Sequence, residues 1–435
     1  MRRFSCFVIA CAILLTGCDN ASLPPTAGYG PNPTLPPPKP EWPIPTIGVA
    51  NAKGWAAGEK PVAAAGLKVE AFATGLVHPR WLYLLPNGDV LVAETVAPPR
   101  PDNNPGFRRW AQSILMRRAG AGGENANRIT LLRDSDGDGT VDLSTTFLEG
   151  LYSPFGMVLL DNILYVGNSN ALMSFRYDDG ATRIAGPGRK VLDLPAGEIN
   201  RHWTRNLVAN PADDTKLFVA VGSNSNAAEF GMDQEVNRAA IWEVDRWTGK
   251  YRIFASGIRN PNGMDFSPGG TLWTVSNERD EIGGDLVPDY MTSVKEGGFY
   301  GWPYSYYGQH VDVRVQPQRP DLVAKAIKPD YALGSHTASL GLSFARGNTL
   351  GDAYQSGVFI GQHGSWNRRP RHGYRVIFVP FDGETPAGMP REVLTGFLND
   401  QGEARGRPVG VITDKTGALL VADDVGNTIW RVTRQ

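Results

Sequence analysis

The chain has no cysteine beyond residue 18, and this limits the chemistry open to it. Its three cysteines are Cys6, Cys11 and Cys18, so the rest of the 435-residue sequence has neither a disulfide nor a reactive thiol. It also has no Cys-x-x-Cys-His motif, which excludes an attached c-type haem. With 43 Lys and Arg against 44 Asp and Glu, the charge gives no reason to expect nucleic acid or an anionic membrane surface as partner.

Long hydrophobic runs are also scarce, and the clearest one opens the chain. The apolar run Phe4–Leu15 follows two arginines and is too short to cross a bilayer comfortably, which is typical of a secretory signal. It ends in Leu-Thr-Gly-Cys18, which resembles a bacterial lipobox. We expect residues 1–17 to be a signal peptide and Cys18 to carry lipid. The protein would then face the periplasm from the bacterial cell envelope, and Asp19 favours the inner membrane. An ordinary export signal is the alternative.

Residues 18–48 are rich in proline and have little that could form a core. The prolines between Asp19 and Pro45 favour an extended, polyproline-like tether of roughly 80 Å, at ~3 Å per residue. We therefore expect a tether over 18–48 and a folded domain over 49–435.

Within that domain, six copies of one phrase recur. Each has a turn with Gly or Pro, a hydrophobic strand, a second turn and another hydrophobic strand. The clear copies are Gly75–Glu94, Gly150–Gly167, Gly257–Glu278 and Gly406–Asp423, and looser ones begin at His202 and His336. One small sheet cannot bury both its faces alone, whereas stacked neighbours can. The sequence therefore predicts an all-β fold, a six-bladed β-propeller of four-stranded antiparallel sheets.

Individual strands are visible as alternating segments. They are Asp89–Glu94, Ile163–Gly167, Lys216–Val221, Ala240–Val244, Thr271–Val275, Arg375–Val379 and Ala418–Ala422. The last segment, Thr428–Val432, is of the kind that closes a propeller ring by completing a blade. Two insertions interrupt the repeats, at residues 98–127 with a helix expected over Trp110–Arg118, and at Arg279–Val323. Such insertions usually shape the entrance to a site.

One acidic loop has two interpretations. Residues Asp134 to Gly139 match the start of a calcium loop, with Asp142 at its ninth position, but Thr145 stands where an EF-hand has a bidentate Glu. The alternative is an Asp/Gly-rich hairpin between strands Ile129–Arg133 and Leu143–Leu148.

Histidines and arginines gather at the starts of the repeats, where a propeller brings residues together. His202, His336 and His363 stand at repeat junctions, and a histidine near neutrality is a natural base for a hydroxyl proton. The arginines at these junctions are Arg80, Arg201, Arg259, Arg368, Arg405 and Arg407. If they converge on the axis, they form a positive funnel suited to a small polyanion.

Several longer motifs carry a family resemblance. They are Arg259-Asn-Pro-Asn-Gly263, Val275-Ser-Asn-Glu-Arg-Asp-Glu281, Val287-Pro-Asp-Tyr290, Gly298-Phe-Tyr-Gly-Trp-Pro303, His363-Gly-Ser-Trp-Asn-Arg368 and Gly406-Arg-Pro-Val-Gly-Val411. In these the chain resembles the sorbosone dehydrogenase family from about Gly54 to its end. That family is related to the soluble aldose and glucose dehydrogenases, which use pyrroloquinoline quinone (PQQ).

The resemblance implies a cofactor with three carboxylates and a Ca²⁺ ion that polarises its quinone carbonyl. It implies that His202 is the catalytic base, and that Arg259 with Asn260 stabilises charge on the quinone oxygens. It places the metal on the backbone carbonyls of Arg279 and Asp280. This chain has Arg-Asp where the relatives have Gly-Pro, so the Asp280 side chain is a further candidate ligand.

The resemblance also implies the remaining cofactor contacts. Arg405 and Arg407 match a cofactor-binding pair, and either His363 or Arg368 takes the place of a lysine. Arg80, Asn224, His336 and Thr337 are further members of the pocket. Tyr300-Gly-Trp302-Pro is either a stacking platform or a buried corner.

The implied activity is oxidation of an aldose or related aldehyde sugar at C1, with electrons passed to an external acceptor, a quinone or a cytochrome. The only membrane contact would be the N-terminal lipid. Two alternatives stay open: a calcium-dependent lactonase and a binding propeller without catalysis.

Overall fold

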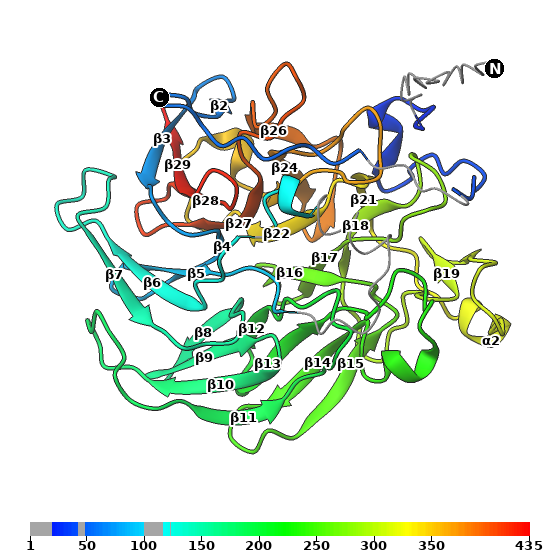
Figure 1. Ribbon diagram of the computed structural model, residues 1–435, viewed down its shortest axis with the longest axis horizontal. Helices are drawn as coiled ribbons and strands as arrows, with labels where there is room; N and C mark the ends of the chain where they lie inside the picture. Colours follow the sequence, from blue (N-terminus) through cyan, green and yellow to red (C-terminus); the bar gives the residue numbers. More distant parts are fainter. Residues whose placement is uncertain (1–19, 42–47, 100–115, 122) are drawn as a thin grey trace, which may run out of the picture.

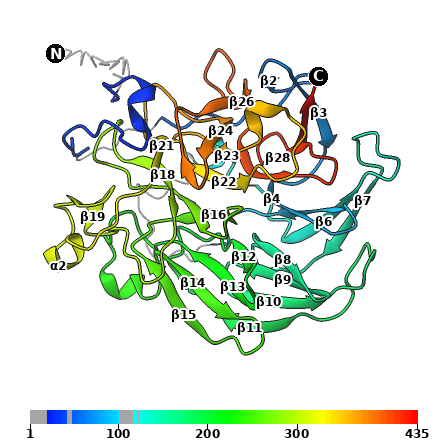
Figure 2. The same ribbon diagram turned by 180° about the vertical axis from the view of Figure 1, so that it is seen from behind.

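Six antiparallel sheets surround one axis in the computed structural model of this chain, which describes residues 20–41, 48–99, 116–121 and 123–435 (Figure 1). The view from behind shows the same ring (Figure 2). The predicted six-bladed β-propeller is therefore confirmed.

The first three blades are each made of four consecutive strands. Blade 1 has β4 (Pro79–Leu84), β5 (Val90–Glu94), β6 (Arg128–Arg133) and β7 (Leu143–Leu148). Blade 2 has β8 (Met157–Leu160), β9 (Ile163–Asn168), β10 (Ala171–Arg176) and β11 (Arg189–Asp193). Blade 3 has β12 (Leu207–Asn210), β13 (Asp213–Val221), β14 (Ala240–Asp245) and β15 (Tyr251–Ser256).

Blades 4 and 5 each gain an extra strand from the N-terminal part of the chain. Blade 4 has β16 (Pro261–Phe266), β17 (Leu272–Ser276), β18 (Pro288–Ser293) and β21 (Tyr331–Ser335), extended by β1 (Tyr29–Gly30). Blade 5 has β22 (Ser339–Phe344), β23 (Gly357–Gln362), β24 (Arg375–Asp382) and β26 (Arg391–Thr395), extended by β2 (Val62–Ala63). A short strand, β25 (Thr385–Pro386), pairs with β24.

Blade 6 joins the two ends of the domain. It contains β27 (Pro408–Thr413), β28 (Leu419–Asp423), β29 (Thr428–Arg434) and, as its outer strand, β3 (Leu67–Ala73). β3 pairs with β29 in antiparallel register, with Val69 opposite Val432. Closure of the ring through the segment Thr428–Val432 is thus confirmed.

Each sequence repeat corresponds to the first two strands of one blade, and each of the seven predicted alternating segments falls on a strand, three of them beginning one residue before it. Glycine lets the innermost strands approach each other at the axis. A Cβ atom on Gly263 of β16 would lie 2.6 Å from the carbonyl oxygen of Leu340 in β22, too close for any side chain. The repeat is therefore visible partly because the crowded axis requires glycine.

The proline-rich segment differs from the extended tether that the sequence predicts. Residues 20–41 pack on blades 4 and 5, where Tyr29 and Gly30 pair with β21. Asp285 accepts hydrogen bonds from the Ser22 and Leu23 amides at 2.6 and 3.0 Å. Proline has no backbone N–H and so prevents regular strand pairing. The other residues of the segment keep amides and side chains that bind the domain surface. Residues 1–19, with the expected signal and Cys18, lie outside the described residues.

The insertions carry little helix. Residues 116–118 are helical, and the rest of the expected helix Trp110–Arg118 lies outside the described residues. The second insertion supplies β18, the short hairpin β19 (Ser305–Tyr306) and β20 (His310–Val311), and α2 (Pro320–Val323). Within the described residues, no helix is long and apolar enough to span a bilayer.

Candidate functional site

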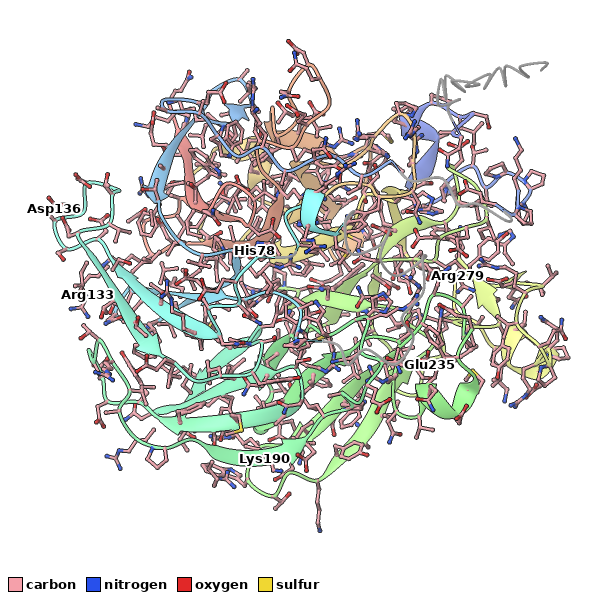
Figure 3. The ribbon with its side chains drawn as sticks, in the orientation of Figure 1. His78, Arg133, Asp136, Lys190, Glu235 and Arg279 are labelled. Carbon is pink, nitrogen blue, oxygen red and sulfur yellow. The ribbon has the colours of Figure 1, made fainter. Side chains whose placement is uncertain are left out.

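The site predicted from sequence lies where the innermost strands begin and the second strands end. Because neighbouring strands are antiparallel, these ends share one face of the ring. In Figure 3, His78 lies near the centre of the ring, Glu235 and Arg279 lie to the right of it, and Arg133, Asp136 and Lys190 lie toward the rim.

His202 is held by the end of β13 in the same blade. Its Nδ1 lies 2.8 Å from the carbonyl oxygen and 3.0 Å from the hydroxyl oxygen of Ser223. The Ser223 hydroxyl donates its own proton to the Ser225 carbonyl at 2.7 Å, so both Ser223 oxygens act as acceptors toward His202. The proton of a neutral His202 therefore sits on Nδ1, and Nε2 is the basic nitrogen.

Asn260 approaches His202 across Gly222. A Cβ atom on Gly222 would lie 2.5 Å both from Asn260 Oδ1 and from His202 Cβ, so the three residues are in close contact. Asn260 Nδ2 donates to Asn277 Oδ1 at 3.1 Å, while its buried Oδ1 has no hydrogen-bond partner in the described chain.

Asn224 lies beside this group. Its backbone amide donates to Glu235 Oε2 at 2.7 Å, and burial raises the pKa of the Glu235 carboxyl despite that bond. Asn224 Oδ1 is a second buried acceptor without a partner among the described residues. Two unsatisfied amide oxygens next to a histidine indicate a position for donor groups of a ligand.

Arg259 gives most of its donors to protein carbonyls. Its Nε and Nη2 donate to the carbonyl and side-chain oxygens of Asn226 at 3.1 and 3.0 Å, and its Nη1 donates to the Glu278 carbonyl at 2.8 Å. Its nearest acid is Asp280, at 3.8 Å. In this structure Arg259 mainly positions the loop from β17.

Asp280 and His336 form a pair between two loops of blade 4, which follow β17 and β21. His336 Nδ1 lies 2.9 Å from Asp280 Oδ1, and its Nε2 lies 3.1 Å from the Gly283 carbonyl. Burial lowers the pKa of His336, but the hydrogen bond and charge of Asp280 outweigh it and raise that pKa overall. The bond to Asp280 therefore favours the protonated form of His336.

Thr337 is buried in the neighbouring network. Its hydroxyl contacts Asp289 Oδ2 at 3.2 Å, and Ser339 and Glu278 donate backbone amides to the same carboxylate. Burial raises the pKa of Asp289 to about 6. Asp289 thus connects the starts of blades 4 and 5.

A second group surrounds Asp424, just after β28. Its Oδ2 lies 2.5 Å from Arg80 Nη1, 2.8 Å from His363 Nε2 and 3.4 Å from His78 Nε2. Burial alone would raise the pKa of Asp424, but these neighbours lower it. Burial, with the charges of Arg407 and Arg80, lowers the pKa of His363 to about 4 despite the bond to Asp424. His363 is therefore neutral beside an ionised carboxylate.

Arg407 is the exceptional arginine of the site. It is fully buried, and its Nη2 donates to the Ala50 carbonyl at 3.0 Å. Its guanidinium lies 5.1 Å from the centre of the Tyr374 ring. Its Nε and Nη1 have no hydrogen-bond partner and no acidic residue pairs with it, within the described part of the chain. An unpaired buried cation is costly, so the arrangement favours an anionic ligand.

The other arginines correct the prediction of a strongly positive funnel. Arg368 pairs with Asp285 at 3.3 Å. Arg405 is one-third exposed and pairs with Glu59 at 3.3 Å. Arg201 is exposed and pairs with Glu229 at 3.2 Å. Sequence shows where arginines stand but not which acids neutralise them.

Left-handed backbone occurs in several of the same loops. His78, Glu281, His336 and Ala338 all have positive φ angles, at 53°, 71°, 58° and 50°. Left-handed backbone is unfavourable for residues other than glycine, and it persists where the surroundings hold it in place. The surrounding contacts therefore hold these loops in place.

Tyr300 and Trp302 form a buried corner. Tyr300 donates its hydroxyl proton to the Ser293 carbonyl at 2.6 Å, and Trp302 Nε1 donates to the Asn226 carbonyl at 3.0 Å. Both side chains are buried, which favours the structural interpretation over a stacking platform.

Sequence reasoning missed His78, Asn226, Asp289 and Asp424. A usable signal was present, because the second strand of most repeats ends in a polar residue such as Glu94, Asn168, Gln362 or Asp423.

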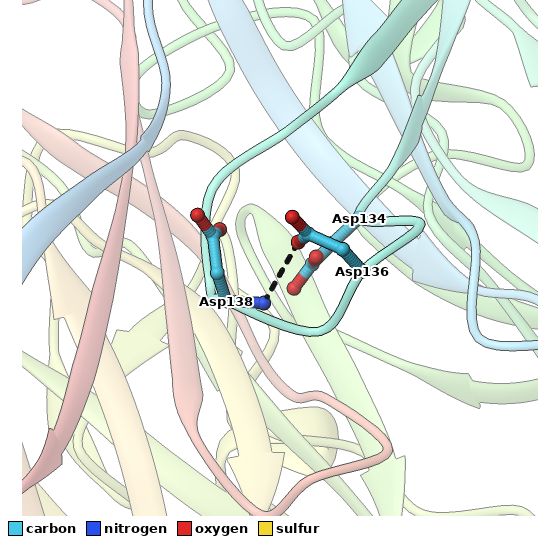
Figure 4. A group of neighbouring side chains, drawn as sticks. All are labelled: Asp134, Asp136 and Asp138. Carbon is cyan, nitrogen blue, oxygen red and sulfur yellow. Dashed lines mark hydrogen bonds between the residues drawn. The ribbon is translucent and has the colours of Figure 1, made fainter.

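The acidic loop lies away from this site. Asp134, Asp136 and Asp138 lie in the turn of the β6–β7 hairpin (Figure 4). One carboxylate oxygen from each lies within 4.8 Å of the others. The Asp138 amide donates to Asp136 Oδ1 at 3.1 Å. The predicted hairpin is confirmed, and calcium binding by the loop stays a prediction.

A surface cleft of about 340 Å³ lies between the outer parts of blades 1 and 2. Phe147, Phe175, Arg183 and Pro187 are among its lining residues. It contains none of the predicted site residues, and we do not assign the site to it.

Comparisons with known proteins agree on the fold. Residues 63–365 match the family described as "Domain of unknown function (DUF7133)", and residues 316–435 match the TrAA12-like family. An uncharacterised protein of Borreliella burgdorferi is 33% identical over 242 residues, which cover 55% of this chain and 62% of that protein. A PQQ-dependent pyranose dehydrogenase of Coprinopsis cinerea is 24% identical over 293 residues, which cover 54% of this chain and 40% of that enzyme. The chain thus spans less than two thirds of either relative.

Solved structures share the propeller at low sequence identity. The holo PQQ domain of the Coprinopsis cinerea pyranose dehydrogenase has a TM-score of 0.70 and 20% identity, over 89% of this chain and all of that domain. A calcium structure of the Trichoderma reesei family AA12 enzyme has a TM-score of 0.69 and 18% identity, over 90% and 99% of the two chains. The apo aldose sugar dehydrogenase of Escherichia coli has a TM-score of 0.57 and 18% identity, over 85% and 100%. The DUF7133 match covers more than half of the sequence, and the chain therefore belongs to the DUF7133 family.

Proposed function

We propose that this chain is a PQQ-dependent dehydrogenase that oxidises an aldose or related aldehyde sugar at C1, as its resemblance to the sorbosone dehydrogenases implies. The observation that carries the proposal is the buried Arg407, whose Nε and Nη1 have no partner in the described chain. The similarity to PQQ-dependent pyranose dehydrogenase supports it.

The residues around the axis fit a flat polyanion. Arg407 and Arg80 each have an unpartnered buried Nε within the described residues, and carboxylates are the acceptors that guanidinium groups bind best. Asn260 and Asn224 offer unpartnered oxygens on the opposite side of the site. PQQ has three carboxylates, together with ring N–H and carbonyl groups, and so offers groups for both sides.

His202 is the base in this proposal. When bound, PQQ supplies the acceptor for the hydride that leaves C1 of the sugar. His202 Nε2 takes the proton of the C1 hydroxyl, while Nδ1 keeps its own proton and donates it to the Ser223 oxygens. Ser223 thereby keeps the ring in one tautomer and orientation.

Arg259 has a positioning role rather than the direct contact that the resemblance implies. Its bonds to Asn226 and Glu278 fix the loop that carries Asp280, and Asn260 provides the polar contact beside His202. His336, Thr337 and His363 complete the surroundings through their carboxylate partners.

The proposal includes partners outside the chain. Electrons leave to an external acceptor, a membrane quinone or a cytochrome. A lipid on Cys18 would anchor the protein at the inner membrane, facing the periplasm.

Cofactor binding is tested by titrating the full chain, purified in detergent, with PQQ while following its fluorescence. We expect near-stoichiometric binding in the wild type and at least ~100-fold weaker binding in Arg407→Ala, since a buried charge pair is lost. Arg201→Ala, which removes an exposed arginine, is the matched control and should bind as the wild type does. Failure of the wild type to bind PQQ would reject the proposal and favour the lactonase or the binding propeller.

Catalysis is tested with a panel of aldoses and a dye acceptor. His202→Gln should bind PQQ normally but oxidise sugars ~100-fold to 10,000-fold more slowly, the usual contribution of a general base.

A further inference from the structure

The backbone carbonyl of Asp280, one of the two that the family resemblance assigns to calcium, already accepts two hydrogen bonds within the protein. Its oxygen accepts hydrogen bonds from Asn226 Nδ2 at 3.2 Å and from Arg314 Nη1 at 3.0 Å. A carbonyl oxygen has two lone pairs, so these two donors occupy both. The Asp280 amide in turn donates to Asn226 Oδ1 at 2.9 Å, which locks the same peptide from its other side.

Arg314 is fixed in this position by Asp312. Its Nε and Nη2 bind the two carboxylate oxygens of Asp312 at 2.9 and 2.7 Å, the paired geometry that suits a guanidinium best. Asp312 is buried and also bonds Arg279 Nη1 at 3.1 Å. Nη1 of Arg314 is left to point at Asp280.

The charges around Asp280 are balanced without a metal. Arg259, Arg279 and Arg314 face the carboxylates of Glu278, Asp280 and Asp312. A Ca²⁺ site normally has several carboxylate oxygens free for the ion, and a dication here would add two charges to three arginines and three carboxylates that already balance. These residues therefore do not fit calcium.

We infer that the guanidinium of Arg314 is a built-in cation at the position assigned to calcium, so that this site takes no Ca²⁺ and needs none. The inference about the metal stands on the chain alone, and its consequence for PQQ rests on the proposed function. The signal in the sequence is the replacement of Gly-Pro by Arg279-Asp280 together with Arg314 in the following insertion.

Calcium binding to the full chain without PQQ tests the inference directly. Equilibrium dialysis with radioactive calcium compares wild type, Arg314→Ala and the control Arg319→Ala, which removes an exposed arginine of the same insertion. The acidic loop at Asp134 contributes equally to all three proteins. We expect Arg314→Ala to bind one more ion per chain than the other two. Equal calcium stoichiometry in wild type and Arg314→Ala would overturn the inference.

PQQ titration in excess calcium and in excess chelator gives the second readout. Wild-type affinity should change less than about twofold between the two media, whereas Arg314→Ala should lose at least ~10-fold in chelator and recover in calcium. A wild type that loses ~10-fold in chelator contradicts the inference whatever the variant does. If PQQ binds in neither medium, the proposed function fails, and the dialysis still decides the role of Arg314.

Discussion

His363 Nε2 lies 2.8 Å from Asp424 Oδ2, although the two residues follow the second strands of different blades. Arg80 and His78, from blade 1, contact the same oxygen. One buried carboxylate therefore joins side chains from blades 1, 5 and 6 at the point where the ring closes. The other carboxylate oxygen of Asp424, Oδ1, has no hydrogen-bond partner among the described residues.

The first prediction concerns the stability of the fold in acid. Folding lowers the pKa of His363 to about 4, from about 6.5 in an unfolded chain. The folded state thus favours the neutral ring, and this stabilisation is complete above pH ~6.5 and is lost as the pH falls toward ~4. Glutamine does not titrate in this range. Between pH ~6.5 and ~4, the free energy of unfolding of His363→Gln should therefore fall by up to about 3 kcal/mol less than that of the wild type. Denaturant unfolding at several pH values measures this, and parallel curves for the two proteins would contradict it.

The second prediction concerns the packing of His202 and Asn260 against Gly222. Gly222→Ala places a methyl group 2.5 Å from Asn260 Oδ1 and from His202 Cβ, so at least one of the two must move. If the proposed function holds, we expect kcat/KM to fall by ~100-fold, since small displacements of reacting groups are costly. The free energy of unfolding should change much less. Gly186→Ala is the control, because a Cβ there meets nothing within 4 Å. Equal activity of Gly222→Ala and Gly186→Ala would contradict the placement of His202 at the site of reaction.

The repeat was readable from sequence for physical reasons. Innermost strands need glycine at positions such as Gly263, where the next blade is too close for a side chain, and their flanking strands alternate between packed faces. Glycine recurs in the innermost strands of blades 4, 5 and 6, at Gly263, Gly341 and Gly410. The axial clustering of His202, Asn260, Asp280 and His336 then follows from the ring.

The ion-pair partners of the charged side chains could not be predicted from the sequence. Arg405 and Arg407 are two residues apart, yet Arg405 is one-third exposed beside Glu59 and Arg407 is fully buried. Arg314, in an irregular insertion, reaches Asp280 only because Asp312 holds it. Such pairings depend on loop conformations that no periodic pattern specifies, and the packing of residues 20–41 was missed for the same reason.

The third prediction tests closure of the ring. Val432 of β29 is fully buried and lies opposite Val69 of β3. Val432→Ala should lower the free energy of unfolding by about 2 kcal/mol, from lost burial and the cavity left behind. Val313→Ala, at a position 72% exposed, should change it by less than ~0.5 kcal/mol. Urea unfolding compares the two, and equal effects would mean that the β3–β29 seam does not limit stability.

The fourth prediction concerns the attachment of the proline-rich segment. Asp285 accepts hydrogen bonds from the Ser22 amide, the Ser22 hydroxyl and the Leu23 amide, and it pairs with the buried Arg368. Asp285→Ala removes these acceptors at once, and each bond to a charged group contributes roughly 1.5–3 kcal/mol.

We therefore expect amide hydrogen exchange at Leu23 to accelerate by at least ~10-fold in Asp285→Ala, while strands of the blades keep their protection. Asp321→Ala, which removes an exposed acid paired with Arg319, is the matched control and should leave Leu23 unchanged. If Leu23 exchanges at the wild-type rate in Asp285→Ala, contacts such as the pairing of Tyr29 with Leu333 must hold the segment by themselves. Residues 20–41 would then be held mainly by strand pairing with blade 4, and Asp285 would contribute little to their attachment.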